Sequence, residues 1–236
     1  PYAGTLFAAA PTAPAAPANA APAQGDLFAP NPADGTAPAV QTPLQSLQDL
    51  DVDYQLVDTE EKRGTMLRIL LTAEILAIDT ETTGTDPMTA RLVGMSICDA
   101  PGRAWYVPVP ADPDEARRIT DHLRPLYENP HTLKVGQNIK YDLIVLQNYG
   151  VRVQGPLFDT MLAHYVLQPE LRHNMDYLAE IYLNYRTIHI DELIGPRGKG
   201  QKSMADLPPA DVYRYACEDA DVTLRLKDAL EKELHD

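Results

Sequence analysis

The sequence predicts an α/β domain, in which a mixed β-sheet is flanked by helices, preceded by a disordered linker. Three observations support this fold class. An N-terminal stretch is rich in alanine and proline, three short apolar runs then follow one another closely, and later apolar runs alternate with helix-like segments. The hydrophobic fraction of 44% is ordinary for a folded protein, and the chain contains no internal repeat.

Residues 1–43 have the composition of a linker. They hold nine of the 21 prolines and fifteen alanines, no lysine or arginine, and only Asp26 and Asp34 as charges. Such a segment has too little apolar surface to offset its ordering entropy. It also lacks the cationic start and apolar core of a signal peptide. We therefore assign residues 1–48 to a disordered Ala/Pro-rich interdomain linker and 49–236 to the folded domain.

The first half of the domain predicts a strand, a helix, a three-stranded meander and a second helix. Asp58 or Thr59 caps the first helix, and the helix dipole favours Glu60 and Glu61 in its first turn. Pro113 suits the first turn of the second helix. In order, we expect a strand at 54–57, a helix to about residue 71, strands at 75–79, 92–98 and 104–109, and a helix at 113–128.

The second half alternates strand and helix, which favours a mixed sheet. Asp159 lies where a helix starts, and we interpret it as an N-cap rather than a metal ligand. The Gly/Lys/Arg-rich stretch "GPRGKGQK" is interpreted as a solvated loop in preference to a strand-binding segment. In order, we expect a strand at 132–136, helices at 138–149, 159–167 and 174–184, the loop at 195–202, and a long helix at 209–234.

Composition and charge exclude several classes of protein. No run of about 18 apolar residues is present, so we expect no membrane-spanning helix. Cys98 and Cys217 lie far apart, which indicates a reducing compartment without a disulfide framework. The six histidines lack metal-ligand spacing, which argues against a zinc site. The net charge of −14 argues against a protein that coats nucleic acid by electrostatic attraction. It is compatible with an enzyme that contacts nucleic acid through bound divalent cations.

The strand that begins at Ile75 runs into two carboxylates. Asp79 and Glu81 are two residues apart, so an extended chain directs both side chains to the same side. Like charges held side by side repel each other, and a buried carboxylate without a partner is costly unless it takes up a proton. The pair therefore predicts a cation between the two side chains.

Two helices also carry a carboxylate on an apolar face. In the last helix Asp219 lies within an apolar stripe, four residues after Tyr215. Glu218 and Asp221 are rotated by about 100° and 200° from it, and we expect them to face solvent. In the helix at 138–149, Asp142 has mostly apolar neighbours three and four residues away, and we expect it to face packed surface. The stripe of the last helix comprises Val212, Tyr215, Ala216, Val222, Thr223, Leu226 and Leu230.

A shared cation site explains these carboxylates most economically. Each one alone could have its own arginine or capping partner. Oxygen-only ligands select Mg²⁺ or Mn²⁺ over Zn²⁺. Two such ions about 4 Å apart could clamp the attacking and leaving oxygens of a phosphodiester. The four candidate ligands are Asp79, Glu81, Asp142 and Asp219.

Three motifs resemble those of a known family. "DTET" at a strand end, "NIKYD" opening a helix and "YACEDAD" on a late helix are similar to the exonuclease motifs of the DEDD superfamily, and Tyr215 marks its tyrosine branch. "FDTMLAHYVL" and "RHNMDYLAE" follow in the same order and spacing. From about residue 52 to 236 the chain resembles the 3′–5′ proofreading exonuclease domain of bacterial family A DNA polymerase I. This resemblance implies a ribonuclease H-like fold and metal-dependent removal of nucleotides from the 3′ end of DNA.

The resemblance also implies residue roles. Asp79, Glu81 and Asp219 would hold the tighter of two divalent cations, Mg²⁺ or Mn²⁺, with Asp79 also bridging toward the second. Asp142 would support the second ion through water. Tyr215 would orient the attacking water or hydroxide together with Glu81. The residues implied to contact the DNA are Thr82, Gln137, Asn138 and Tyr141, with Arg172 near the phosphates.

Two positions depart from the family pattern. Thr85 stands where many relatives have a leucine that wedges the last two bases, and Ile190 stands where an aromatic residue often stacks on a base. Base stacking contributes about 1–3 kcal/mol per base, so we expect a weaker grip on the 3′ end. The metal ligands are unaffected.

Two alternative functions were weighed against DNA proofreading. An RNA-trimming nuclease of the RNase D type shares the tyrosine branch, but the segment at 187–204, "TIHIDELIGPRGKGQKSM", looks like the polymerase family instead. A catalytically weak or inactive exonuclease fold could serve as a scaffold beside a polymerase. Inactive versions typically lose a carboxylate, and here all four are present, which favours an active enzyme.

The resemblance implies partners as well. These are the single-stranded 3′ end of DNA, a covalently attached polymerase domain C-terminal to this segment, and a 5′-nuclease domain N-terminal to the linker. The chain carries no polymerase signature, so we expect a fragment of a longer protein. We expect a monomer without a membrane partner, located in a bacterial cytoplasm at the nucleoid.

Overall fold

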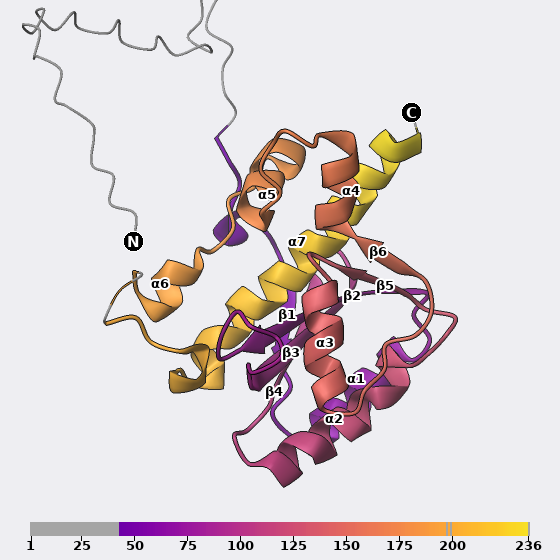
Figure 1. The fold of residues 1–236 in the computed structure, drawn as a ribbon, viewed down its shortest axis with the longest axis vertical. Coiled ribbons are helices and arrows are strands. Elements are labelled where there is room, and N and C mark those ends of the chain that lie inside the picture. Colours follow the sequence, from indigo (N-terminus) through magenta and orange to yellow (C-terminus); the bar gives the residue numbers. More distant parts are fainter. Residues whose placement is uncertain (1–42, 197, 199, 236) are drawn as a thin grey trace, which may run out of the picture. The chain divides into compact units, whose positions relative to one another are not determined.

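The computed structural model describes residues 43–196, 198 and 200–235, and residues 1–42 of the predicted linker lie outside this part. The described chain forms a six-stranded sheet with helices on both faces (Figure 1). The strands are β1 (Asp53–Leu56), β2 (Ile75–Thr82), β3 (Leu92–Ala100), β4 (Arg103–Pro108), β5 (Leu133–Gly136) and β6 (Leu157–Asp159). The helices are α1 (Glu60–Leu70), α2 (Pro113–Tyr127), α3 (Lys140–Asn148), α4 (Thr160–Leu167), α5 (Met175–Leu183), α6 (Ile190–Ile194) and α7 (Pro209–His235), with 3₁₀ turns at Leu47–Asp49 and Met204–Asp206.

The sheet is mixed, as predicted. Its strand order is β1-β4-β3-β2-β5-β6. Strands β2, β3 and β4 form the expected antiparallel meander, whereas the pairs β1/β4, β2/β5 and β5/β6 are parallel. The parallel neighbour β5 and its following helix α3 therefore stand directly beside β2, the strand that carries two candidate metal ligands.

Two elements that carry candidate ligands differ from their predicted boundaries, and two short elements were not predicted. Strand β2 continues to Thr82, so both of its carboxylates lie within the strand. Helix α3 begins at Lys140 rather than at Asn138, because Asn138 has a left-handed backbone with φ of 60°. The short strand β6 and the five-residue helix α6 were not expected from the sequence, since neither is long enough to show a period.

Side chains of β2 alternate between two layers of helices. Leu76 and Ile78 pack in the cluster formed with α1, α2 and α3, whereas Ala77 packs against α7 on the opposite face. The same alternation directs Asp79 and Glu81 to the α7 face. The register of this one strand thus places two carboxylates under the last helix.

Helix α7 is packed on more than one side. Ala216 and Ala220 contact the sheet, whereas Leu226 and Leu230 pack with α4 and α5 (Figure 1). The centre of this helix consequently has almost no solvent face. Its position between the sheet and the α4/α5 pair fixes the height of Asp219 above β2.

The expectation that Glu218 and Asp221 face solvent is wrong. Glu218 is fully buried and Asp221 is 1% exposed. Burial of these carboxylates is possible because each accepts two hydrogen bonds from neutral donors. The donors belong to other parts of the chain, so the spacing of residues along α7 alone could not predict them. The donors are Tyr185 Oη (2.6 Å) and Ile188 N (2.7 Å) for Glu218, and Tyr54 Oη (2.8 Å) and Gly102 N (2.9 Å) for Asp221.

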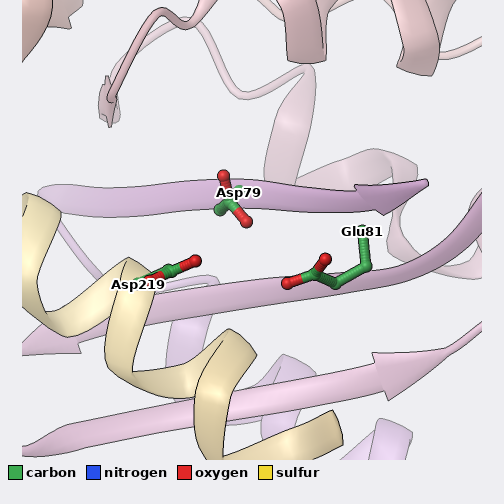
Figure 2. Close-up of side chains that lie close together, drawn as sticks. All are labelled: Asp79, Glu81 and Asp219. Carbon is green, nitrogen blue, oxygen red and sulfur yellow. The ribbon is translucent and has the colours of Figure 1, made fainter. Parts of the chain in front are cut away.

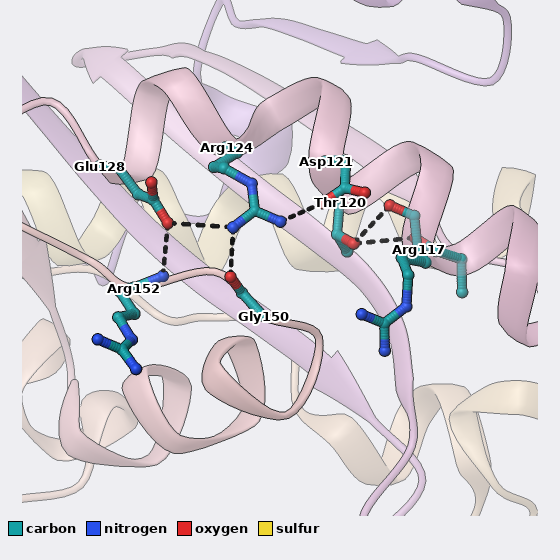
Figure 3. A network of polar contacts seen from close by, with 8 residues as sticks. Arg117, Thr120, Asp121, Arg124, Glu128, Gly150 and Arg152 are labelled. Carbon is teal, nitrogen blue, oxygen red and sulfur yellow. Dashed lines mark hydrogen bonds and ion pairs between the residues drawn. The ribbon is translucent and has the colours of Figure 1, made fainter.

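A polar network ties α2 to the turn that follows α3 (Figure 3). Arg124 pairs with Asp121 and Glu128 and donates to the carbonyl of Gly150, and the Arg152 N–H donates to Glu128 Oε1 at 2.9 Å. Exposed ion pairs stabilise a fold only slightly. Their role here is positional, since they hold the C-terminal end of α3 against α2.

The first described residues already contact the domain. The Gln45 N–H donates to the Asn184 carbonyl at 3.0 Å, and the Arg186 N–H donates to the Gln45 carbonyl at 2.8 Å. Leu47 is 6% exposed. Contacts with the folded part thus begin a few residues before the boundary assigned from composition. Within the described chain, no helix is long and apolar enough to cross a membrane.

Candidate active site

Three carboxylates meet between β2 and α7. One oxygen each of Asp79, Glu81 and Asp219 lies within 4.8 Å of the others. Figure 2 shows these side chains turned toward a common point between the strand and the helix. The strand alternation supplies two of them and the buried stretch of α7 supplies the third. We call these three residues the carboxylate trio.

The trio is electrostatically strained without a cation. Burial raises the pKa of Asp79 to about 6. Burial and the neighbouring Asp79 and Asp142 raise the pKa of Glu81, and burial with Asp79 and Glu81 raises the pKa of Asp219. Glu81 is 6% exposed, and its Oε1 has no hydrogen-bond partner among the described residues. An orphaned buried carboxylate oxygen facing two further carboxylates fits a divalent cation, which prefers oxygen ligands.

Asp142 approaches from the other face of the sheet. It lies on α3, is 3% exposed, and accepts a hydrogen bond of 2.6 Å from Thr80 Oγ1. It does not belong to the 4.8 Å trio. Burial and the nearby Asp79 raise its pKa, and Asp142 in turn contributes to the raised pKa of Glu81, so it is a neighbour of these two members of the trio. The arrangement therefore provides one position where the three carboxylates of the trio could hold a cation. A second region, which we call the flank, lies beside it around Asp79 and Asp142.

Tyr215 lies one turn before Asp219 on α7. Its side chain is half-buried beside the trio. Burial, followed by the charges of Asp219 and Glu81, raises the pKa of its hydroxyl. The hydroxyl therefore stays protonated at neutral pH and serves as a hydrogen-bond donor rather than as a base.

Two of the predicted DNA-contact residues, Thr82 and Tyr141, lie together at the C-terminal end of β2. The hydroxyl oxygens of Thr82 and Tyr141 are 2.6 Å apart, and both hydroxyls hydrogen-bond the carbonyl of Gly84. This contact fixes α3 to the loop after β2. Thr85, in the same loop, is exposed.

The other three predicted contact residues are held by protein partners. Gln137 donates to the His173 carbonyl at 2.6 Å and accepts from Thr160 Oγ1. Asn138 accepts from Lys140 Nζ. The exposed Arg172 lies over the Tyr177 ring at 4.8 Å. Gln137 is thus committed to positioning the 172–173 segment, while Arg172 lies at the surface.

The remaining sequence candidates lie farther out on the surface. Ile190, at the start of α6, is 38% exposed. Within "GPRGKGQK", Arg197 and Lys199 lie outside the described residues, and Lys202 is exposed.

Asp159 does more than the N-cap role predicted for it. The cap is confirmed, since Asp159 Oδ1 accepts from Met161 N at 3.0 Å and Leu162 N at 3.2 Å at the start of α4. The same carboxylate also accepts from Asn138 N at 3.0 Å and Ile139 N at 3.1 Å. It therefore holds the left-handed turn that precedes α3, about one helical turn before Asp142. Sequence spacing carried no signal for this second contact.

We expect Asp159→Asn to slow catalysis without disturbing the trio. One amide oxygen keeps the Oδ1 contacts, and asparagine is a good N-cap. The amide nitrogen, however, replaces the Oδ2 acceptor of Ile139 N, so the start of α3 loosens. Loss of such a supporting contact costs about 10- to 100-fold in rate. The measurement is kcat and KM on a DNA oligonucleotide, together with thermal stability.

Asp112→Asn is the matched control for this variant. Asp112 caps α2 through Glu115 N at 2.9 Å and is exposed. It should cost some stability and leave the kinetic constants unchanged. Equal kinetic losses in the two variants, or wild-type kinetics in Asp159→Asn, would contradict the positioning role.

Sequence comparison matches most of the folded part. A model of the 3′–5′ exonuclease family matches residues 54–235. The DNA polymerase I of Pseudomonas aeruginosa is 39% identical over 203 residues, which is 82% of this chain and 22% of that protein. The DNA polymerase I of Chloroflexus aurantiacus is 34% identical over 226 residues, 94% of this chain and 23% of that protein. The chain thus spans between a fifth and a quarter of these relatives.

A solved structure with a similar fold is Brucella melitensis NrnC. It superposes with a TM-score of 0.60 at 22% identity and covers 78% of this chain and 82% of that one. A second structure of that protein, described as having bound Mg²⁺, gives a TM-score of 0.56 at 22% identity over 79% of this chain and 83% of that one. At this identity the likeness concerns the fold, and it confirms the ribonuclease H-like mixed sheet expected from the sequence.

Proposed function

The chain belongs to the 3′–5′ exonuclease family represented in bacterial DNA polymerase I, and from this membership we propose that it removes nucleotides from the 3′ end of DNA with two divalent cations. The observation that carries this proposal is the carboxylate trio, because buried like charges with an orphaned Glu81 oxygen need a cation. A phosphodiester is a suitable substrate, since its hydrolysis requires stabilisation of anionic oxygens.

The residues present fit a two-ion centre. Asp79, Glu81 and Asp219 would hold one ion, and Asp79 with Asp142 would hold the other. We propose Mg²⁺ or Mn²⁺, because all candidate ligands are oxygens. When bound, such ions supply a Lewis acid for the scissile phosphate and a more acidic attacking water.

The side chains around the ligands have separate tasks. Tyr215 donates a hydrogen bond to the attacking water, and Glu81 holds the other side of that water. Thr82, Asn138 and Tyr141 position the terminal nucleotide. The exposed Arg172 would lie near the strand's phosphates, and Gln137, expected at the terminal nucleotide, also holds the neighbouring His173 carbonyl. Holding the water and the phosphodiester in this orientation lowers the entropic cost of bringing them together for hydrolysis.

We expect Tyr215→Phe to lower kcat and to leave metal binding intact. The ring stays in its packing site and only the hydroxyl is lost. Removing one oriented hydrogen bond to the attacking water lowers the rate by about 10- to 100-fold. Single-turnover degradation of DNA at saturating Mn²⁺ measures this effect.

Tyr213→Phe is the control on the same helix. Tyr213 is also half-buried and packed on the sheet cluster. Its variant should retain the wild-type rate. A rate in Tyr215→Phe equal to that of the control would remove the hydroxyl from the mechanism.

The size of the relatives extends the proposal to the whole protein. Because the chain covers only 22% of the Pseudomonas aeruginosa protein, we propose that it works as a proofreading domain in the same polypeptide as a polymerase domain. In this arrangement residues 1–48 are the linker and 49–236 the exonuclease domain. Its place of action would be the bacterial nucleoid, and its substrate a frayed single-stranded 3′ end.

Degradation of a 5′-labelled single-stranded DNA oligonucleotide tests the function. The reaction is compared in Mg²⁺, Mn²⁺ and EDTA, with an RNA of the same sequence alongside. We expect a ladder that shortens from the 3′ end of the DNA with either ion and no product in EDTA. Preferential loss of the RNA would favour the RNase D-type alternative. Intact DNA and RNA with either ion would favour an inactive scaffold.

A further inference from the structure

A second feature capable of binding a ligand lies outside the trio. A cavity of about 560 Å³ opens between the N-terminal ends of α1 and α2, strands β3 and β4, and the segment 205–209 before α7. Arginines and carboxylates line it together with apolar side chains, including Val93, Tyr106 and Ile119. None of its lining residues is a candidate metal ligand.

Arg63 is the unusual residue of this cavity. It lies on α1 and is 5% exposed, and its Nε is buried without a hydrogen-bond partner among the described residues. In the described chain its guanidinium also forms no ion pair within 4.0 Å, although it lines the cavity. An arginine stays charged at any ordinary pH, so a buried guanidinium without a partner is costly to the fold. A cost of this kind is typical of a group that serves a ligand.

The carboxylates nearby are already paired with other cations. Asp58 accepts from Lys62 Nζ at 2.7 Å. Glu60 and Glu115 lie 3.4 Å and 3.6 Å from the guanidinium of Arg118. Arg118 itself lines the cavity, and the third arginine there is the half-buried Arg91, whose guanidinium likewise forms no ion pair in the described chain. Among the described residues the guanidinium groups of Arg63 and Arg91 therefore line the cavity without an ion pair within 4.0 Å, and Asp58 is a nearby carboxylate whose pKa is lowered by Lys62 and, to a smaller extent, by Arg63.

The cavity lies beside the carboxylate trio. Gly94 is opposite Glu81 in the β2/β3 register. The Tyr106 ring covers Gly94 so closely that a Cβ there would collide with its hydroxyl. Tyr106 thus contacts the strand beneath Glu81 on one side and lines the cavity on the other. A ligand in the cavity would be a neighbour of the exonuclease centre without sharing its ligands.

We propose that this cavity is a phosphate site in which Arg63 and Arg91 bind the phosphate group of a nucleoside 5′-monophosphate. A guanidinium presents paired N–H donors that match phosphate oxygens. The half-buried side chains of Pro108, Pro110 and Leu207 offer apolar surface for the nucleoside. The choice of ligand rests on the proposed function, because 3′–5′ hydrolysis releases nucleoside 5′-monophosphates beside this cavity.

Binding to the full chain in EDTA tests the site apart from the metal centre. Thymidine 5′-monophosphate and inorganic phosphate should raise the melting temperature, and thymidine should not. Arg63→Met should weaken nucleotide binding about 10- to 100-fold, because charged hydrogen bonds are lost. Without ligand, Arg63→Met should melt at a higher temperature than wild type, since a buried unpaired charge is gone. Arg68→Met, an exposed arginine on the same helix, is the control and should bind normally.

A second variant covers the case in which Arg63→Met does not fold. Arg91→Gln changes only the half-buried arginine and should also weaken nucleotide binding. The proposal is overturned if wild type binds no nucleotide, if both arginine variants bind like wild type, or if Arg63→Met folds but melts below wild type with binding retained.

Asp79→Asn should bind thymidine 5′-monophosphate normally in EDTA, and loss of binding there would place the nucleotide at the trio. If the nucleotide binds at the arginines but the chain does not degrade DNA, the proposed function is contradicted and the phosphate site is still supported.

Discussion

Replacing Asp79 by asparagine abolishes exonuclease activity and stabilises the metal-free fold. The variant removes a carboxylate of the trio that is also a neighbour of Asp142 and is proposed to hold both ions, so neither proposed ion keeps its full ligand set. We expect the rate to fall by about a thousandfold or more, which corresponds to about 4 kcal/mol of lost transition-state stabilisation. Degradation of a 5′-labelled DNA at saturating Mn²⁺ measures the loss.

The gain in stability follows from the sign of the pKa shift. Burial raises the folded-state pKa of Asp79 from 3.8 to about 6, so the folded chain holds this proton more tightly than the unfolded chain. The metal-free wild type therefore loses stability as pH rises from about 4 to about 6, and the loss persists at higher pH. Asparagine carries no charge, so its advantage should be on the order of 1–3 kcal/mol near pH 8 and smaller near pH 5.

Urea unfolding in EDTA at these two pH values checks the stability change. Divalent cations should stabilise the wild type by binding the folded state and should stabilise Asp79→Asn much less. Asp51→Asn, at an exposed position, serves as the control and should alter neither activity nor the pH dependence. An active Asp79→Asn enzyme, or a variant less stable than wild type in EDTA, would be incompatible with a cation-dependent trio.

The trio could be predicted because its residues obey local periodicity. Asp79 and Glu81 share a strand face by the two-residue repeat, and the apolar stripe of α7 includes Asp219 by the helical repeat. Asp79 and Glu81 stood out because they follow an apolar strand segment, and Asp219 stood out because its neighbours three and four residues away belong to the apolar stripe. The same reasoning failed for Glu218 and Asp221, because periodicity describes one face of a helix and α7 is covered on several.

Other parts of the site depend on contacts that sequence spacing does not encode. Asp159 reaches Asn138 and Ile139 through the parallel pairing of β6 with β5, and a three-residue strand leaves no period to detect. The commitment of Gln137 to the His173 carbonyl is likewise a long-range contact. Arg63 appeared in the sequence as one more charge on a helix, and only its burial shows that it lacks a partner among the described residues. Local pattern located the candidate metal ligands, and tertiary packing determined the contacts that support them.

Asp142→Asn separates the two proposed ions. Asparagine can still accept the hydrogen bond from Thr80, so the side chain keeps its place between α3 and β2. The lost charge belongs to the flank beside Asp79 and not to the trio. We expect a rate about 100- to 1000-fold lower, because stabilisation of one reacting oxygen disappears. Calorimetric titration with Mn²⁺ should show one ion fewer per chain, with the tighter ion retained.

Thr80→Val is the matched variant for this test. It removes the hydrogen bond that holds Asp142 but keeps the charge, so we expect both ions to bind and the rate to fall by about tenfold, as for other supporting contacts. If Asp142→Asn lost both ions, the four carboxylates would form one indivisible site despite the separation of Asp142 from the trio. If it kept the wild-type rate, a single ion held by Asp79, Glu81 and Asp219 would suffice for the chemistry. A large loss of rate with one ion retained is the result that only the two-ion arrangement explains.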